Sequence, residues 1–152
     1  MIIVFTGTRR GMTKQQQASV AWLLEKLCST KRNVLARHGA AKGADREFHA
    51  LAFARGVRLT AYPSTKEQVR WALTRTHQLV SVRPTQPPLI RNKTMVMGGG
   101  AGKADVLIAT PAEAEEVLRS GTWATIRNAR RALVAIRMIV QPLGNMIEET
   151  RP

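Results

Sequence analysis

Short apolar segments alternate with amphipathic helical segments along most of this chain, and this alternation is the strongest constraint on its fold. The first apolar segment ends at Gly7 and the third ends at Pro63, as strands end at turns. Between the first two segments, apolar residues recur at i, i+3, i+4 and i+7 from Val20, on one helical face. The pattern predicts strands over residues 2–6, 34–37, 57–62, 104–110 and 134–140.

Helices are predicted between these strands. The first begins after Thr13, which forms a capping-box pattern with Gln16. Residues 81–90 contain three prolines and predict a loop, and the segment from Gln141 onward is expected to be irregular. Strands that alternate with helices form a parallel sheet covered on both faces, so the predicted fold class is α/β. The other helices are expected over residues 44–55, 66–80, 91–97 and 124–133, with one or two helical turns over 113–118.

Composition excludes several classes of protein. With 152 residues, 44% of them hydrophobic, the chain can form one globular domain with its own core. Cys28 is the one cysteine, which excludes an intramolecular disulfide and a cysteine-rich zinc site. The apolar runs are shorter than the about 18 residues of a membrane span, and no basic segment precedes the first of them. We therefore expect a cytoplasmic protein that binds no metal and does not contact a membrane.

Positive charge dominates the first two thirds of the chain. Lysine and arginine total 24 against 10 acidic residues, which makes the net charge +14. Residues 1–103 hold 18 basic and 4 acidic residues, whereas residues 104–152 hold 6 of each. Arginine supplies 17 of the positive charges, and guanidinium groups match phosphate oxygens well. Such a surface favours nucleic acid, a nucleotide or a phosphorylated small molecule as partner. Alternatively, the positive charge serves only solubility or reflects a general bias toward arginine.

Open parallel sheets bind ligands beyond the carboxyl ends of their strands, so the residues after each strand form the candidate site. The first strand leads into 6-TGTRRGM-12, where Gly7 and Gly11 permit close approach of a backbone. Thr8, Arg9 and Arg10 lie between these glycines, and the loop suits a phosphate or carboxylate. It matches neither the GxxxxGK[ST] nor the GxGxxG pattern. The alternative is a tight turn with two solvated arginines.

The second strand leads into 38-HGAAKGAD-45. Gly39 and Gly43 bracket a turn whose N–H groups can face an anion at the start of the next helix. Asp45 can cap that helix or accept a hydrogen bond from a ribose hydroxyl, and the alternative is a carboxylate that only interacts with the helix dipole. His38, beside a glycine, is more typical of structural hydrogen bonding than of catalysis.

Two later segments complete the candidate site. Arg91 and Asn92 follow the proline-rich loop. The segment 120-SGTW-123 opens a helix, and its tryptophan can stack on a base; the alternative is an ordinary cap followed by a core tryptophan. No Ser–His–Asp signature, nucleophile elbow or metal-ligand spacing is present. The helix that begins at 120-SGTW-123 can offer a phosphate the donors of Ser120, Gly121 and Thr122.

In their order and spacing, these segments resemble the SLOG superfamily, a Rossmann-like group that includes the DprA and LOG (lysine decarboxylase-like) proteins. The resemblance is to its small YpsA-related branch, common in bacteria and phages, and HGxAxGAD is the most specific element. It extends over residues 1–140, one SLOG-like domain, and leaves 141–152 as a C-terminal tail. The matching segments are 6-TGTR-9, 38-HGAAKGADREFHALA-52, 59-LTAYP-63, 91-RN-92, 104-ADVLIA-109 and 120-SGTWATIRNA-129.

This resemblance implies a single three-layer α/β/α domain with a mostly parallel five-stranded sheet, in a strand order near 3-2-1-4-5. It also implies a nucleotide held between the first loop and the Gly-Thr loop, and association into homo-oligomers. LOG-type hydrolases carry a Pro-Gly-Gly-x-Gly-Thr-x-x-Glu signature. Here Gly121 and Thr122 are kept, whereas Thr125 stands at the glutamate position. Glycosidic cleavage needs a carboxylate, so LOG-type enzyme activity is not the leading expectation.

The leading hypothesis is a protein that senses or sequesters a nucleotide-type small molecule and needs no other cofactor. One alternative is a nucleoside monophosphate glycosidase (phosphoribohydrolase) in which Asp45 or another acid replaces the glutamate. A second is single-stranded DNA binding in the manner of DprA. Aromatic residues make up 5% of the chain, which leaves few stacking platforms, so we expect only weak nucleic-acid binding. The predicted ligand-binding residues are Gly7, Thr8, Arg9, Gly39, Gly43, Asp45, Arg91, Asn92, Ser120, Gly121 and Thr122.

Overall fold

The computed structural model describes residues 1–74 and 80–150. Within these residues the chain forms one seven-stranded sheet, in the order β4-β3-β2-β1-β5-β6-β7, and five helices. Neighbouring strands are parallel except for β6 and β7, which are antiparallel. The elements are β1 (Ile2–Gly7), α1 (Lys14–Thr30), β2 (Leu35–His38), α2 (Ala44–Phe53), β3 (Arg58–Ala61), α3 (Lys66–Leu73), β4 (Val80–Val82), α4 (Pro88–Met97), β5 (Val106–Thr110), α5 (Gly121–Arg131), β6 (Ile136–Val140) and β7 (Met146–Thr150).

The predicted α/β class and the central strand order are confirmed. The five predicted strands are β1, β2, β3, β5 and β6, and their order β3-β2-β1-β5-β6 corresponds to 3-2-1-4-5. The predicted number of strands is wrong, because β4 and β7 extend the sheet at its two edges. The segment from Gln141, predicted to be irregular, forms a turn and then β7. In that turn, Gly144 N–H donates to the Gln141 carbonyl and Gln141 N–H to the Asn145 carbonyl, both at 2.8 Å.

The helices differ from the prediction mainly at their ends. Thr13 and Gln16 form the predicted capping box at the start of α1. α3 ends at Leu73, and the part of the predicted 66–80 helix over residues 75–79 lies outside the described residues. α4 begins at Pro88 because proline is compatible with the first turn of a helix. Residues 113–118 form bends and a turn, so the predicted helical turn there is wrong.

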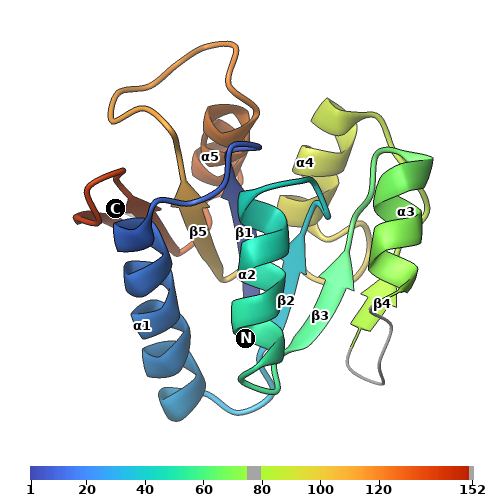
Figure 1. Cartoon of the computed structure of the whole chain (residues 1–152), viewed down its shortest axis with the longest axis horizontal. Coiled ribbons are helices and arrows are strands. Elements are labelled where there is room, and N and C mark those ends of the chain that lie inside the picture. The colour runs from blue at the N-terminus through green and yellow to red at the C-terminus, as the bar shows by residue number, and fades with distance from the viewer. Residues whose placement is uncertain (75–79, 151–152) are drawn as a thin grey trace.

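Helices cover both faces of the sheet (Figure 1). α1 and α2 pack on one face, where the rings of Phe5 and Phe48 stack at 4.2 Å between centroids. α4 and α5 pack on the other face, with Met95 and Ile126 against β1 and β5. The two cores contain apolar side chains from alternating positions of the same strands, which is why the central strands are nearly continuously apolar.

Arg37 on β2 is the largest fully buried side chain that the structure describes. Its guanidinium donates to the carbonyls of Met95 at 3.2 Å, Ala101 at 2.6 Å and Gly102 at 2.8 Å. These bonds fasten the glycine-rich connection between α4 and β5 to the sheet. The arginine therefore has a structural role that its place in a predicted strand did not reveal.

The carboxyl ends of the parallel strands lie at one edge of the sheet. β1 pairs with β2 on one side and with β5 on the other. The strands that follow β1 in the sequence lie on one side of it in the sheet, and those that follow β5 lie on the other, so the switch point of the sheet lies between β1 and β5. Ligands of open α/β sheets bind at such a switch point. The connections β1–α1, β2–α2 and β5–α5 all leave from this edge, and the last forms a long arch in Figure 1.

In the described part of the chain, no helix is long and apolar enough to cross a membrane.

Candidate functional site

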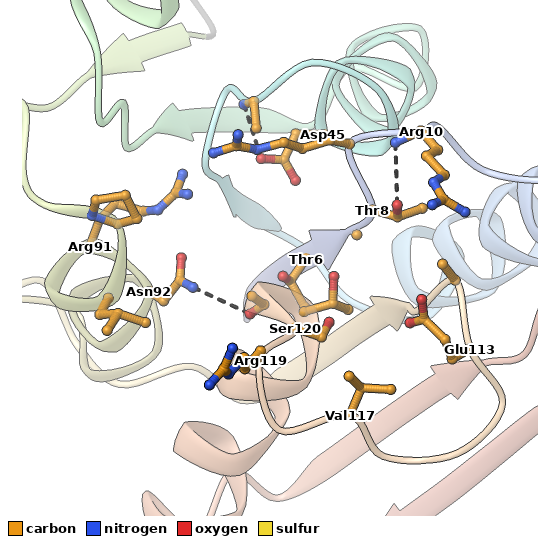
Figure 2. A pocket seen from close by; sticks show the side chains of 18 of the residues that line it. Thr6, Thr8, Arg10, Asp45, Arg91, Asn92, Glu113, Val117, Arg119 and Ser120 are labelled. Atoms are coloured by element: carbon orange, nitrogen blue, oxygen red, sulfur yellow. Dashed lines mark hydrogen bonds between the residues drawn. The ribbon is translucent and has the colours of Figure 1, made fainter.

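A pocket of about 520 Å³ opens at this switch point, within the size range of small-molecule sites. Figure 2 shows Asp45 and Arg10 on one side of it and Arg119 and Ser120 on the other, with Arg91 at one end. The walls come from the β1–α1 loop, the β2–α2 turn, α4 and the β5–α5 connection. The lining residues are Thr6, Gly7, Thr8, Arg9, Arg10, Ala41, Asp45, Pro88, Leu89, Arg91, Asn92, Met95, Ala112, Glu113, Val117, Arg119, Ser120, Gly121 and Thr122.

The β1–α1 loop is a closed turn that presents two arginines. Gly11 N–H donates to the Thr8 carbonyl at 3.2 Å, and Arg10 N–H donates to the Thr8 hydroxyl at 3.2 Å. Glu47 of α2 accepts from the Met12 N–H at 2.6 Å and holds the end of the loop. The side chains of Arg9 and Arg10 are exposed, so their charges are available at the pocket.

Gly39 and Gly43, predicted to bind ligand, lie behind the pocket rather than in its lining. A side chain at Gly39 would overlap the guanidinium of Arg91 and approach the carboxylate of Asp45. At Gly43, φ is +79° and a side chain would overlap the backbone of Arg9. Both glycines therefore allow neighbouring pocket residues to approach the β2–α2 turn closely.

The start of α5 forms the opposite wall. The hydroxyl of Ser120, the N-cap, accepts from Trp123 N–H at 3.4 Å. The side chain of Asn92 donates to the Gly121 carbonyl at 3.3 Å, and so connects α4 to the first turn of α5 (Figure 2). Trp123 is 4% exposed and packs in the core, outside the pocket lining, so stacking of this ring on a base is not supported.

The β5–α5 connection is held by ion pairs that continue to the edge of the sheet. Glu116 pairs with Arg127 at 3.0 Å and with Arg130 at 2.8 Å, both on α5. Arg130 also pairs with Glu149 of β7 at 2.6 Å, and Glu149 pairs with Arg137 of β6 at 3.0 Å. These arginines lower the pKa values of both glutamates, chiefly through hydrogen bonds. The wall of the pocket is therefore tied to the terminal hairpin.

The pocket is positively charged overall, with a buried carboxylate at its inner end. Four arginines line it, at 9, 10, 91 and 119, against the carboxylates of Asp45 and Glu113. Asp45 is 6% exposed and accepts from Ala41 N–H at 3.1 Å. Burial raises the pKa of Asp45 to about 6, and the attraction of Arg91 limits this rise. Burial lowers the pKa of Arg91.

Replacing Asp45 with asparagine is expected to stabilise the fold at neutral pH. Since the folded pKa of about 6 lies above the ordinary 3.8, the native state binds more protons than the unfolded state between these values. Ionisation of Asp45 therefore lowers stability as pH rises through that window. Asparagine does not ionise and can still accept from Ala41. We expect D45N to exceed the wild type by about 2–3 kcal/mol at pH above 7, and by little below about pH 4.

Urea unfolding of both proteins across this pH range measures the difference between their free energies of unfolding. A difference that is the same at every pH would contradict the assigned pKa of Asp45.

Thr125, which the sequence resemblance aligns with the LOG glutamate, is fully buried and does not line the pocket. Its hydroxyl donates to the Gly121 carbonyl at 3.0 Å and lies 3.4 Å from the Thr6 hydroxyl. The threonine thus joins the first turn of α5 to the end of β1. Over the described residues, no group of three or more histidine, cysteine or acidic side chains could hold a metal ion.

Nine of the eleven predicted residues line the pocket, and the exceptions are Gly39 and Gly43. That these eleven residues bind a ligand stays a prediction. Sequence reasoning missed the contribution of Glu113 and Val117, because residues 113–118 were predicted to be helical, and it missed Arg119, which follows that segment. The signal that could have identified them is their position directly after the central strand β5.

Together the fold and the pocket define a Rossmann-like α/β domain with a pocket at its switch point. No protein-family model and no curated protein matches the sequence. Among solved structures, the chain is similar to DNA processing protein A (DprA) from Streptococcus pneumoniae, with 22% identity and a TM-score of 0.59 over 91% of this chain. It is also similar to DprA from Helicobacter pylori, a structure described for its single-stranded DNA binding mode, with 17% identity and a TM-score of 0.61 over 91% of this chain.

The chain covers 49% of the first DprA chain and 64% of the second, thus less than two thirds of either. At these identities the likeness is one of fold. The chain shares a Rossmann-like fold with these two DprA structures over 91% of its length.

Proposed function

We propose that this protein binds a nucleotide or nucleotide-derived ligand in the switch-point pocket, as a sensor or a sequestering protein. The observation that carries the proposal is the convergence of two loops on one pocket of about 520 Å³. The turn at residues 7–10 supplies two exposed arginines, and the first turn of α5 supplies the hydroxyls of Ser120 and Thr122. The ligand phosphate lies between these two loops.

The start of α5 suits a phosphate for two reasons. The first N–H groups of a helix have no partner within it, and the helix dipole places partial positive charge at this end. Ser120 satisfies the N–H of Trp123, which leaves those of Gly121 and Thr122 for a ligand. Arg119 precedes this turn and also lines the pocket. A dianionic phosphate therefore meets directed donors as well as net positive charge.

We propose binding rather than glycosidic cleavage, because Thr125 stands where LOG-type hydrolases carry their glutamate, and a threonine cannot supply the carboxylate that cleavage needs. The pocket carboxylates are those of Asp45 and Glu113. Asp45 already accepts a backbone N–H and lies beside Arg91, which favours a role in recognition. We further propose a relationship to YpsA-like and LOG-like proteins, based on the sequence segments that resemble them.

Single-stranded DNA binding is the second candidate, favoured by the net charge of +14 and the DprA-like fold. Such binding rests on many backbone phosphates and weakens steeply with salt. A nucleotide in a preformed pocket makes a few directed contacts and is less sensitive to salt. One arginine variant distinguishes the two.

Replacing Arg9 with alanine is expected to lower the affinity for nucleoside monophosphates at least about tenfold, because a charge-assisted contact to phosphate is lost. Retention of a single-stranded oligonucleotide should hardly change, since one charge among 24 is removed. Arg58→Ala is the matched control, because Arg58 is an exposed arginine outside this pocket. Calorimetry measures the first affinity, and fluorescence anisotropy at several salt concentrations measures the second.

Two results would contradict the proposal. One is equal nucleotide affinity for Arg9→Ala and Arg58→Ala. The other is oligonucleotide binding that is micromolar or tighter at physiological salt and is lost in Arg9→Ala, which would favour the DNA-binding candidate.

A further inference from the structure

The inner end of the pocket contains two buried charged side chains that keep hydrogen-bonding capacity for a ligand. Asp45 is 6% exposed and Arg91 is 8% exposed, and both line the pocket. One terminal nitrogen of Arg91 donates to the Tyr62 carbonyl at 3.0 Å, whereas its Nε is buried and has no hydrogen-bond partner among the described residues. A buried donor without an acceptor costs about 1–3 kcal/mol, so Nε–H marks a place for an acceptor brought by a ligand.

The carboxylate of Asp45 excludes a phosphate from this inner end. Two anionic groups in contact in a buried site repel each other strongly. The carboxylate instead needs a donor, and the arginine beside it needs an acceptor. Neighbouring hydroxyl groups meet both needs, because each hydroxyl has one donor and two acceptor lone pairs.

The inner end lies directly beside the proposed phosphate loop. Ala44 N–H donates to the Thr8 carbonyl at 3.1 Å, and Gly43 packs against the backbone of Arg9. Asp45 is the next residue of α2. In a nucleotide the sugar is bonded to the phosphate and the base lies beyond the sugar. The part of a nucleotide that reaches Asp45 from a phosphate at Thr8 is therefore the sugar.

The remaining lining offers little to a base. No aromatic side chain is among the pocket residues that the structure describes, and the apolar ones are mainly aliphatic, such as Pro88, Leu89 and Val117. Base–aromatic stacking, worth about 1–3 kcal/mol per base in other proteins, is therefore missing from this site. Discrimination between ligands is expected to depend on the sugar more than on the base.

We propose that Asp45 and Arg91 recognise the vicinal hydroxyls of a ribose, which makes the pocket selective for ribonucleotides over 2′-deoxyribonucleotides. One hydroxyl donates to the Asp45 carboxylate, and the Nε–H of Arg91 donates to the oxygen of its neighbour. This inference rests on the proposed nucleotide-binding function. A ribose hydroxyl would give the Asp45 carboxylate a hydrogen-bond donor at a place where burial raises its pKa.

Calorimetric titrations with AMP, 2′-deoxy-AMP, GMP and ribose 5-phosphate test the inference. Loss of a hydrogen bond to a charged group reduces affinity roughly ten- to a hundredfold, so AMP is expected to bind that much more tightly than 2′-deoxy-AMP. GMP and ribose 5-phosphate are expected within about tenfold of AMP. Equal affinities for AMP and 2′-deoxy-AMP would overturn the ribose assignment and leave the proposed function standing. Absence of binding by all four compounds would overturn the proposed function itself.

The variant D45N locates the selectivity. Asparagine keeps the acceptor for Ala41 N–H but removes the negative charge, so the preference for AMP over 2′-deoxy-AMP should fall below about threefold. The matched control is Asp105→Asn, because Asp105 accepts from Ile2 N–H at 2.7 Å outside the pocket. The control should keep the full preference. A preference that survives in D45N would assign ribose recognition to other residues and overturn the inference.

Discussion

Replacing Gly43 with alanine is expected to reduce the free energy of unfolding by about 3 kcal/mol or more and to abolish nucleotide binding. The backbone at Gly43 has φ +79° and ψ −128°, a conformation that side chains disfavour. The added methyl group would also overlap the backbone of Arg9 and Gly11, which cannot move aside as a flexible side chain could. The β1–α1 loop must therefore shift away from α2, and the pocket changes shape with it.

Gly56→Ala is the matched control for this change. Gly56 also has a positive φ, of +69°, but a side chain there would meet nothing within 4 Å. Its substitution should cost only the backbone strain, roughly 1 kcal/mol, and leave binding intact. Thermal and urea unfolding measure the loss of stability, and calorimetry measures binding. Equal losses in the two variants would show that the close approach at Gly43 is unimportant.

Acid is expected to destabilise the protein through the buried pair formed by His38 and His49. Ala40 N–H donates to Nδ1 of His38 at 3.1 Å, so Nε2 of His38 carries the proton. That nitrogen then donates to Nδ1 of His49 at 3.0 Å. Burial, the neighbouring His49 and Arg91 together lower the pKa of His38 to about 3.

The folded pKa of His38 lies below the ordinary value of 6.5, so the unfolded state binds the proton first. The stability that the neutral ring provides is complete above pH 6.5 and is lost as pH falls toward 3. At 1.36 kcal/mol per pKa unit, this loss approaches about 5 kcal/mol. It acts against the effect of Asp45, whose ionisation lowers stability as pH rises between about 4 and 6.

Heteronuclear NMR of the imidazole nitrogens measures the protonation of His38 directly in the folded protein. We expect the neutral Nε2–H form of His38 to persist at pH 5, where an ordinary histidine is charged. Urea unfolding of wild type and His38→Gln gives the linked loss of stability, which should be smaller in the variant. Titration of His38 near pH 6.5 in the folded state would contradict this prediction.

Periodicity predicted the elements that pack against the core, because burial requires apolar residues at fixed spacing. The apolar run of β5 and the helical face that contains Val20 are such cases. The pocket residues of the β1–α1 loop, and Asp45 after β2, were predictable from their positions after parallel strands, whose carboxyl ends meet at one edge. These predictions depend on local patterns alone.

Features that depend on distant partners were not predictable. The side chains of β7 are mostly exposed, and its sequence shows no alternation of apolar and polar residues. The strand forms because it pairs with β6. Arg37 is buried because the connection around residues 98–102 closes over it and supplies carbonyl acceptors. Asp45 and Arg91 lie 46 positions apart in the sequence, and only the folded chain shows that both are buried in one pocket.

The ion pairs around Arg130 can couple ligand binding in the pocket to the stability of the β6–β7 hairpin. Glu116 of the β5–α5 connection and Glu149 of β7 bind the same guanidinium. If a ligand changes how Glu116 holds Arg130, the stability of the β6–β7 hairpin changes by the same coupling free energy with which the hairpin changes ligand affinity. Because these charges are partly exposed, salt weakens the coupling in both directions equally.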